Sequence, residues 1–424
     1  MALSIDYSPL EQAQKRLDVL GKNIANVNTS GYKKFSFSDD LKSAGAIQDF
    51  SQGSVTSTNK PLDIAITGDS LFRMEKNGVV TYSRNGQFSL SKENYIVDGF
   101  GGYLTGYGLD SNGNIDESSL VPLTISKAES KPIATTTASL NITLDSRVSA
   151  ILTAAPAEAA SVKNTYSVKT FDANDPASFN YSTFVTAYDS LGASHTLQTY
   201  FVKRETYYTQ VEAVAANKVA GDVKESWWDL YATYDNKNLA ADNTGKAIPV
   251  QKLTFSTSGT INKFTNGNYG IDITLPNNSK INISMAGTQQ RGSSFSSDAT
   301  QNGLSSAALT GYSVDQDGFV NAMYANGTTA KMAQVVLAKF NNFQGLKQEA
   351  NNQWSESPES GAAQIGKAGD PKFGVLQGGA LESSNVDLTV EMVKLISAQR
   401  AFQSAAEVLK KQDEIMQNIN NISR

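Results

Sequence analysis

Hydrophobic positions near the N-terminus recur with the spacing of a helix. Apolar residues follow one another at alternating intervals of three and four within residues 8–28, which is the pattern of a coiled-coil seam. The seam consists of Leu10, Ala13, Leu17, Leu20, Ile24 and Val27. Ser8-Pro9 supplies an N-cap with a proline at the first helical position, and Gly31 supplies a C-terminal stop. We therefore predict one amphipathic helix over residues 8–28.

The last forty residues carry the same pattern over a longer stretch. The seam residues fall seven apart, at Leu388, Leu395, Phe402, Leu409 and Met416, with Met392, Ala398, Ala405 and Ile419 beside them. Asn385 or Asp387 can cap this helix, and Asp387 and Glu391 suit the positive end of its dipole. At ~1.5 Å per residue, the predicted helix is roughly 50 Å long.

Between the two ends the pattern indicates β-strands. Short apolar runs at 63–67, 71–74, 79–82 and 87–90 are separated by Asn77-Gly78 and Asn85-Gly86, dipeptides that favour hairpins. Asp317-Gly318 and Asn326-Gly327 give similar signals further along the chain. Strands rich in threonine and aromatic residues are predicted at 182–188, 196–202 and 227–233. The fold class we predict is mainly β with long terminal α-helices.

Neither terminal seam has a large apolar surface to pack on in its own part of the sequence. The two ends are therefore expected to come together, which makes the β domains nested insertions. The seams then pack on each other, as a helical hairpin that caps the β domains, or on other copies of the chain in a polymer. The predicted domains are a terminal coiled-coil domain (1–30 and 384–424), an extended connector (31–66 and 366–383), a middle β domain (67–145 and 286–365) and an outer β domain (146–285).

Composition narrows the function classes. The net charge is −5, without the basic excess typical of a nucleic-acid-binding protein. The chain has no cysteine and a single histidine, His195, so thiol nucleophiles, Cys-based metal sites and multi-histidine metal sites are excluded. No run of 18 apolar residues exists and the N-terminus lacks the features of a secretory signal, so we expect neither membrane insertion nor a cleaved signal peptide.

Two segments resemble chemical sites and fail the requirements of each. Residues 110–116 alternate oxygen-bearing side chains like a calcium loop, but Ile115 and Val121 occupy the positions that need glycine and glutamate. His195 follows Asp189 and Ser190 without a nucleophile elbow, so we predict a histidine of a turn or strand. No catalytic residue, cofactor or metal ligand is predicted.

Two motifs at the ends of the chain resemble those of the bacterial flagellar rod and hook axial proteins. They are residues 23–33 (Asn-Ile-Ala-Asn-Val-Asn-Thr-Ser-Gly-Tyr-Lys) and residues 379–388, which are followed by Glu391-Met392 and residues 397–402. Residues 61–68 and 82–88 are similar to the β region that the family shares. The motif residues are Asn23, Asn26, Thr29, Gly31, Tyr32, Lys33, Leu381, Glu382, Ser384, Asn385, Val386 and Asp387.

The long middle part favours the hook proteins within this family. Residues 189–195, 199–203 and 253–261 resemble the outer domain of hook proteins, and rod members are too short to contain it. The resemblance implies a structural subunit, not an enzyme, which self-assembles into a curved helical tube outside the cell and transmits torque from rod to filament as a universal joint. It implies as partners other copies of the chain, the distal rod protein, the hook-cap protein, the hook–filament junction protein and the flagellar type III export apparatus.

The resemblance also assigns roles to the two helices and leaves rivals to test. It places the terminal helices in the inner layer of the tube, with the seam residues from Leu10 to Val27 and from Leu388 to Met416 as the assembly interface. One alternative within the family is a rod or hook–filament junction protein. The alternative from another class is a secreted β-rich adhesin or carbohydrate-active protein.

Overall fold

The computed structural model describes residues 8–37, 46–111, 113–151, 169–207 and 223–422. The chain divides into two compact units. The first unit combines residues 1–128 with residues 308–424, and the second contains residues 129–307. The first unit is thus built from both ends of the chain, and the second is one continuous insertion.

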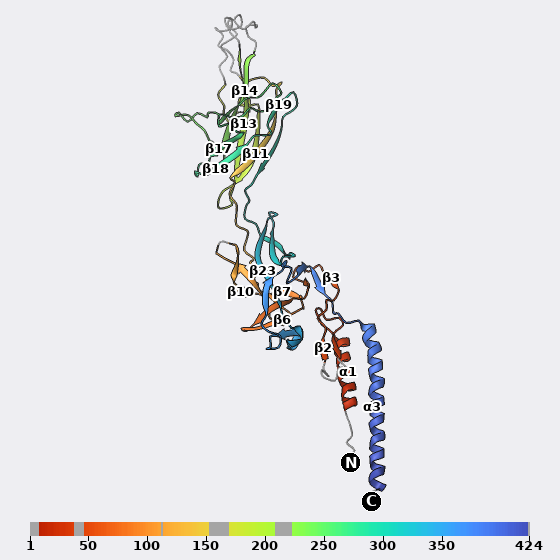
Figure 1. The fold of residues 1–424 in the computed structure, drawn as a ribbon. Coiled ribbons are helices and arrows are strands. Elements are labelled where there is room, and N and C mark those ends of the chain that lie inside the picture. Colours follow the sequence, from red (N-terminus) through yellow and green to blue (C-terminus); the bar gives the residue numbers. More distant parts are fainter. Residues whose placement is uncertain (1–7, 38–45, 112, 152–168, 208–222, 423–424) are drawn as a thin grey trace, which may run out of the picture. The chain divides into compact units, whose positions relative to one another are not determined.

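The first unit contains helices α1 (Ser8–Ala25) and α3 (Leu388–Ile422) (Figure 1). Asp387 caps α3, because its Oδ1 accepts the N–H groups of Thr389 and Val390 at 2.9 and 3.1 Å. The predicted helix over 8–28 is wrong at its C-terminal end. There the backbone N–H of Asn26 donates to the carbonyl of Asn23, which tightens the last turn, so Val27 lies beyond the helix.

The strands of the first unit come from both of its sequence segments. The N-terminal segment contributes β1 (Phe35–Phe37), β2 (Ala46–Gln48), β3 (Val55–Ser57), β4 (Ile64–Thr67), β5 (Leu71–Lys76), β6 (Val79–Ser83), β7 (Phe88–Leu90), β8 (Ile96–Asp98), β9 (Tyr103–Leu109) and β10 (Ile115–Pro122). The C-terminal segment contributes β21 (Leu309–Val314), β22 (Phe319–Tyr324), β23 (Thr329–Lys339), β24 (Lys347–Gln348), β25 (Gln353–Ser355), β26 (Gln364–Lys367), β27 (Val375–Gly378) and β28 (Ala380–Glu382), with the 3₁₀ turns η3 (Phe343–Gly345) and η4 (Ala350–Asn352).

The main sheet interleaves these two segments. Its order is β21-β22-β23-β9-β5-β6-β25-β24, so strands from the start and the end of the sequence are hydrogen-bonded neighbours. The core between them is apolar, with Phe72, Leu104 and Val335 fully buried. Two smaller pairings, β27 with β4 and β28 with β3, bring the C-terminal segment back beside the N-terminal one before α3 begins. Neither segment can complete this core without the other.

The hairpin signals have mixed outcomes. Asn77 and Gly78 both have positive φ and connect β5 to β6, as predicted, and Gly318 and Gly327 lie in the turns of the β21–β22 and β22–β23 hairpins. Asn85-Gly86 is not a hairpin turn, because β6 pairs with β5 and β25 whereas β7 pairs with β8. Gly86 is instead required for packing, since a Cβ there would lie 1.7 Å from the carbonyl oxygen of Ile64.

The second unit is a sandwich of two five-stranded sheets. Its elements are β11 (Thr137–Asp145), η2 (Pro176–Ser178), β12 (Tyr181–Tyr188), β13 (Ser194–Tyr207), β14 (Val223–Tyr234), β15 (Lys237–Asn238), β16 (Gln251–Leu253), β17 (Gly270–Thr274), β18 (Lys280–Ser284), β19 (Gln289–Arg291) and β20 (Ser296–Gln301). One sheet contains β11 and β17–β20 and the other contains β12–β16. Buried side chains of both sheets, such as Ile142 on β11 and Trp228 on β14, share one core.

The predicted strands of this unit are confirmed, since β12, β13 and β14 contain the runs at 182–188, 196–202 and 227–233. The predicted outer domain, 146–285, lies inside the second unit. The unit reaches further in both directions, because β11 and β20 pair along residues 138–143 and 296–301.

Candidate assembly site and its buried polar junction

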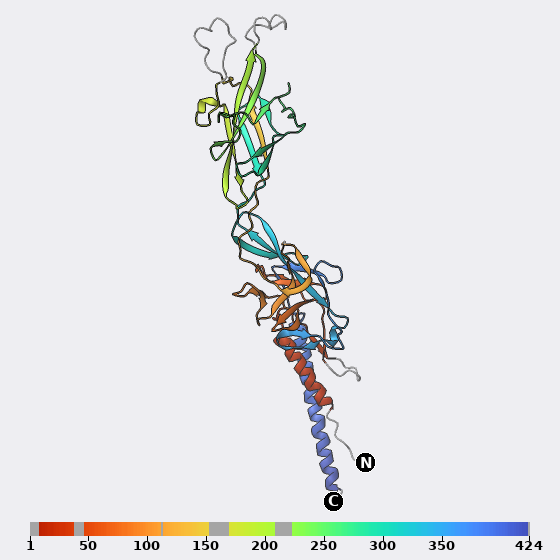
Figure 2. The same ribbon diagram turned by 90° about the vertical axis from the view of Figure 1, so that its left-hand side faces the viewer.

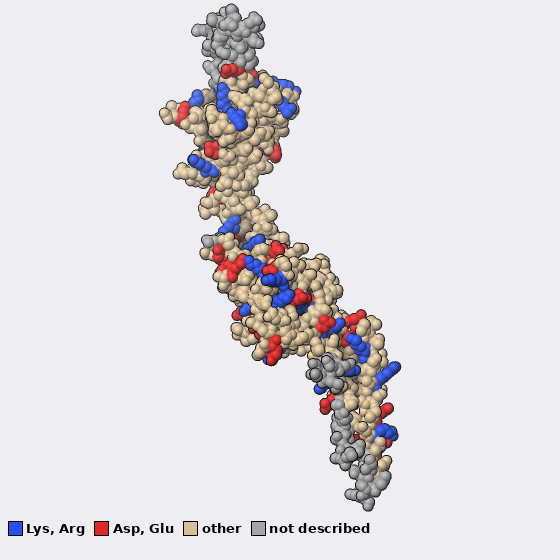
Figure 3. Space-filling view, in the orientation of Figure 1, with Lys and Arg blue, Asp and Glu red and all other residues tan. Residues whose placement is uncertain are grey.

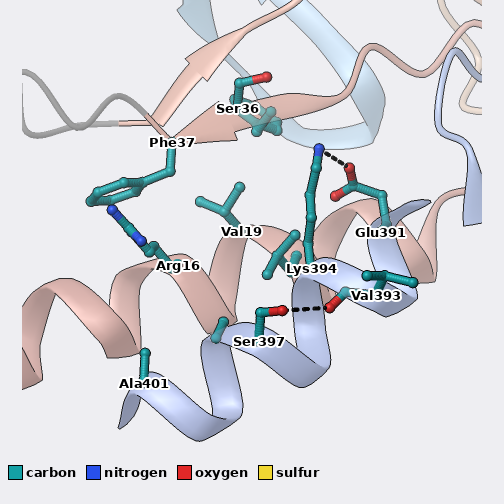
Figure 4. Close-up of a pocket in the computed structure, with 12 residues that line it drawn as sticks. Arg16, Val19, Ser36, Phe37, Glu391, Val393, Lys394, Ser397 and Ala401 are labelled. Atoms are coloured by element: carbon teal, nitrogen blue, oxygen red, sulfur yellow. Dashed lines mark hydrogen bonds and ion pairs between the residues drawn. The ribbon is translucent and has the colours of Figure 1, made fainter. Parts of the chain in front are cut away.

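The two terminal helices pack against each other in opposite directions (Figures 1 and 2). Near the end of α1, the Nδ2 of Asn23 donates to the Oε2 of Glu391 in the first turn of α3 at 2.9 Å. A small hollow lies next to this contact (Figure 4). It is lined by Leu20 of α1 and by Ala398 and Ala401 further along α3. The chain thus contains a helical pair made from its own two ends.

The predicted seam of α1 is partly buried. Ala13 and Leu20 are buried, whereas Leu10, Leu17 and Ile24 are half-buried. Val27, in the turn after the helix, is also half-buried. Val19 is buried as well, although it lies outside the predicted seam. The seam is therefore covered along only part of its width.

The predicted seam of α3 is more open. Leu395, Phe402 and Leu409 are half-buried and Ala398 is buried, whereas Leu388 and Met392 are 46% and 45% exposed. Met416 lies in the last third of the helix. A seam with large exposed apolar residues at its start is not satisfied by α1.

Further exposed apolar side chains on α3 lie outside the predicted seam. They are Val390 (47%), Val393 (62%), Ile396 (50%), Val408 (57%) and Ile415 (54%). Charged side chains are visible along the right-hand edge of the lower part of α3 (Figure 3). A search of the sequence for a second apolar stripe at helical spacing would have found these residues. Exposed apolar surface of this kind marks a site of contact with other molecules.

A buried amide connects the two helices to the first strand. The Oδ1 of Asn23 accepts the N–H of Phe35 at 2.8 Å and the hydroxyl of Tyr32 at 3.3 Å. Its Nδ2 donates to the carbonyl of Phe35 at 2.7 Å as well as to Glu391. Asn23 is fully buried and uses both ends of its amide, so the position of α1 relative to β1 and α3 is specified by directional bonds.

A buried ionic cluster lies a short distance along the chain from this amide. The Oε1 of Glu382 accepts the Nζ of Lys33 at 2.7 Å, and its Oε2 accepts the Nε of Arg84. The three side chains are 1%, 1% and 3% exposed, in the order Glu382, Lys33, Arg84. They come from β28, from the segment after α1 and from the segment after β6. This junction, formed by Lys33, Arg84 and Glu382, joins three segments far apart in sequence.

Backbone carbonyls accept further hydrogen bonds from the two cations. Lys33 also donates to the carbonyl of Ser51 at 2.6 Å, and Arg84 donates to the carbonyls of Ile66, at 2.9 Å, and Ser70. Burial lowers the pKa of Lys33 below its usual value, and nearby Arg84 lowers it further, whereas Glu382 opposes this shift. Because two cations share one carboxylate, Glu382 is the residue on which the charge balance depends.

Tyr32 adds a second titratable group to this region. Burial, together with the negative charge of Glu391, raises its pKa to about 12. The phenol therefore stays protonated at all physiological pH values and remains a donor to Asn23.

The other motif residues surround these two clusters. Gly31 has a φ of 70° and its N–H donates to the carbonyl of Glu382 at 2.8 Å. The Oδ1 of Asn385 accepts the N–H of Lys34 at 2.7 Å, and its Nδ2 donates to the carbonyl of Asp49 at 2.9 Å. Asn385 thus joins the connecting segments, and Asp387 is the residue that caps α3. The remaining members have local roles: Asn26 accepts the hydroxyl of Thr29, Ser384 accepts the N–H of Val386, and Leu381 and Val386 are buried.

The two segments that resemble chemical sites lie in a turn and at the start of a strand. His195 is the second residue of β13, and its Nδ1 and Nε2 lie 2.7 Å and 3.5 Å from carboxylate oxygens of Asp235 and Asp189. Its ring stacks on Tyr234. Asp110 accepts the N–H of Asn114 in the turn between β9 and β10, and Asn112 is outside the described residues. Among the residues that the structure describes, no cluster of acidic or histidine side chains could hold a metal ion, and neither helix is long and apolar enough to cross a membrane.

Comparisons with known proteins agree with the terminal motifs and the insertion. Sequence models match at residues 7–33 (Flagella basal body rod protein), 144–304 (Flagellar basal body protein FlaE D2 domain) and 377–422 (Flagellar basal body rod FlgEFG protein C-terminal). Flagellar hook protein FlgE of Escherichia coli (strain K12) is 35% identical over 100% of both chains. The Salmonella typhimurium (strain LT2) protein of the same name is 34% identical, also over 100% of both chains. A crystal structure of Helicobacter pylori flagellar hook protein FlgE2 aligns with a TM-score of 0.46 at 14% identity, over 77% of this chain and 100% of that one.

Proposed function

Because this chain belongs to the flagellar hook protein family and is a structural subunit of the bacterial flagellar hook, we propose that it polymerises through the exposed apolar face of its terminal helical pair. The observation that carries this proposal is the first three turns of α3, where five apolar side chains are close to half exposed or more. They are Leu388, Val390, Met392, Val393 and Ile396. An uncovered apolar surface on a subunit is stabilised when a neighbouring subunit covers it.

The polymer we propose is a curved helical tube that acts as a universal joint between rod and filament. The helical pair forms its inner layer, and the β units form the outer layers. The junction of Lys33, Arg84 and Glu382 supports this role, because it ties the chain segments on either side of the helices into the β structure of the same unit. Torque can then pass from the helices to the sheet through buried, directional bonds.

The partners we propose follow from the family. Flagellar relatives of this kind assemble with other flagellar components, and we infer contacts with the distal rod protein, the hook-cap protein, the hook–filament junction protein and the type III export apparatus. The location is the flagellar hook, and we propose that the chain reaches it by flagellar export, outside the cell. The adhesin and carbohydrate-active alternatives are not favoured by relatives that match the whole chain.

Aspartate substitutions on the exposed face test the assembly mechanism. Met392→Asp with Ile396→Asp is expected to abolish tube formation, because each added charge would have to be buried in the interface. Both side chains are at least 45% exposed in the single chain, so the fold should persist. Electron microscopy of concentrated protein and circular dichroism measure these two properties.

A matched variant separates assembly from charge alone. Gln399→Asp with Gln403→Asp adds the same charge at exposed polar positions of the same helix and should still form tubes. Tubes from the Met392/Ile396 variant would refute the proposed interface.

A further inference from the structure

Five Asn-Gly pairs lie wholly within the described part of the chain, and each could modify itself without an enzyme. The backbone nitrogen of the glycine can attack the side-chain carbonyl carbon of the asparagine, because glycine has no Cβ to obstruct the approach. The five pairs begin at Asn77, Asn85, Asn266, Asn302 and Asn326. Their surroundings differ, so we expect them to react at different rates.

In four of these pairs the side-chain carbonyl of the asparagine is held by the backbone. The Oδ1 atoms of Asn85, Asn266 and Asn326 each accept the N–H of the residue two positions further on, at 3.1 Å. The Oδ1 of Asn302 accepts two backbone N–H groups, both at 3.0 Å. These hydrogen bonds fix the orientation of the carboxamide, and their loss adds to the barrier of any reaction that turns the side chain.

Asn77 differs from the other four. Within the described residues its side chain has no hydrogen-bond partner, and Asn77 and Gly78 are both exposed in the turn between β5 and β6. A Cβ at Gly78 would meet nothing within 4 Å, so the backbone of the turn has room to move. Rotation about the Cα–C bond of Asn77 then brings the glycine nitrogen against the side chain.

We propose that Asn77 is a site of spontaneous modification, at which the carboxamide becomes a carboxylate. The nitrogen of Gly78 forms a bond to Cγ of Asn77 as the bond from Cγ to the side-chain nitrogen breaks. The proton of the Gly78 nitrogen leaves with the amide nitrogen as ammonia. Water then opens the five-membered imide at either of its carbonyls and gives aspartate or isoaspartate, so no oxidant or reductant is needed.

Both products change the turn. Each adds a negative charge next to Lys76, whose Nζ donates to the carbonyl of Phe100. Aspartate is compatible with the positive φ at position 77. Isoaspartate adds one main-chain carbon between Lys76 and Val79, the residue pair that closes the hairpin, and a two-residue turn has no place for it. The converted fraction therefore records the age of the folded protein.

Peptide mapping by mass spectrometry tests the assignment on the full chain kept at mildly alkaline pH. The peptide with Asn77 is expected to gain the acid at least about fivefold faster than the peptides of the other four pairs, because each of those first loses a hydrogen bond. Asn77→Asp provides the chromatographic standard for the aspartate product and should show no gain of acid in this peptide. A rate at Asn266 or Asn326 equal to that at Asn77 would overturn the assignment.

Unfolding separates the effect of the structure from that of the local sequence. In concentrated guanidinium chloride the hydrogen bonds at Asn85, Asn266, Asn302 and Asn326 are lost, so the rates of these four pairs should rise toward the rate at Asn77. An unchanged lead of Asn77 in the unfolded chain would show that its neighbours in sequence set the rate, and would overturn the structural explanation.

Discussion

At the residue scale, the motifs that identify this family are explained by two buried polar clusters. The sequence motif contains Asn23, Tyr32, Lys33 and Glu382, and all four lie in these clusters. Their partners could not be predicted from the sequence, because Lys33 and Glu382 are 349 positions apart and Arg84 lies in a different motif. Spacing along the chain carries no information about such contacts until the fold is known.

Removal of the charge at Glu382 should destabilise the first unit strongly. Glu382→Gln leaves Lys33 and Arg84 buried without a counter-charge, and breaking a buried ion pair in this way costs about 3–5 kcal/mol. The free energy of unfolding, measured with urea, gives the result. Glu414→Gln, which removes one partner of an exposed ion pair, should change it by less than about 1 kcal/mol. Equal effects of the two variants would refute the importance of the junction.

The single histidine should titrate above its usual range. The hydrogen bond to Asp235, supported by Asp189, raises the pKa of His195 above 6.5, and Asp235 itself has a lowered pKa. A raised histidine pKa adds stability that is fully present below pH 6.5 and is lost as the pH rises through the folded-state pKa.

The imidazole proton resonances in the NMR spectrum report this titration without overlap, because the chain has one histidine. Asp235→Asn should bring the measured pKa down toward 6.5. The exposed Asp242→Asn, in a separate turn, serves as the control and should leave it unchanged. An identical titration in wild type and Asp235→Asn would contradict the pairing.

At the element scale, local signals predicted the elements better than their connections. Apolar periodicity predicted both helices, and alternation with turn dipeptides predicted the β5–β6 hairpin. The same reasoning was wrong for Asn85-Gly86, where glycine serves a close approach to Ile64 and not a turn. It also missed the exposed face of α3 at Val393 and Ile396, because the heptad seam accounted for the pattern on its own.

Two glycines with the same backbone conformation should respond differently to substitution. Gly31 and Gly78 have φ of 70° and 78°, so alanine in this left-handed region costs about 1–2 kcal/mol at either position. A Cβ at Gly31 would also lie 2.5 Å from the carbonyl carbon of Arg84, whereas a Cβ at Gly78 meets nothing within 4 Å. Gly31→Ala should therefore lower the free energy of unfolding by at least about 2 kcal/mol more than Gly78→Ala. Equal losses in urea unfolding would show that the segment moves to accept the methyl group.

At the scale of the whole molecule, the nested organisation follows from matching helices at the two ends. That argument predicted that the chain ends meet. In the structure, β5, β6 and β9 lie beside strands of the C-terminal segment in one sheet. The limits of the insertion were harder to predict, since β11 and β20 belong to the second unit by pairing with each other and not by any change in composition. The finer division of the first unit into helical, connector and middle β domains stays a prediction.

The second unit should fold alone and be dispensable for tube formation. Its sequence is continuous, and at its boundary the N–H of Ser130 donates to the carbonyl of Ala307 at 2.9 Å, so a short Gly/Ser linker can replace it. The isolated fragment 129–307 should unfold in one cooperative transition, measured by calorimetry, and the protein without it should still form tubes in electron micrographs. A fragment without a transition, or a deletion variant that aggregates without helical order, would show that the units depend on each other.

The shared carboxylate of Glu382 also restricts how the sequence can diverge. Loss of Glu382 would leave two buried cations without a counter-charge, because Lys33 and Arg84 pair with the same acid. Lineages that lose the acid at position 382 should therefore also lose the cations at positions 33 and 84, whereas exposed positions such as Gln399 and Gln403 can change independently. Replacement of the acid alone by a neutral residue is expected to be rare.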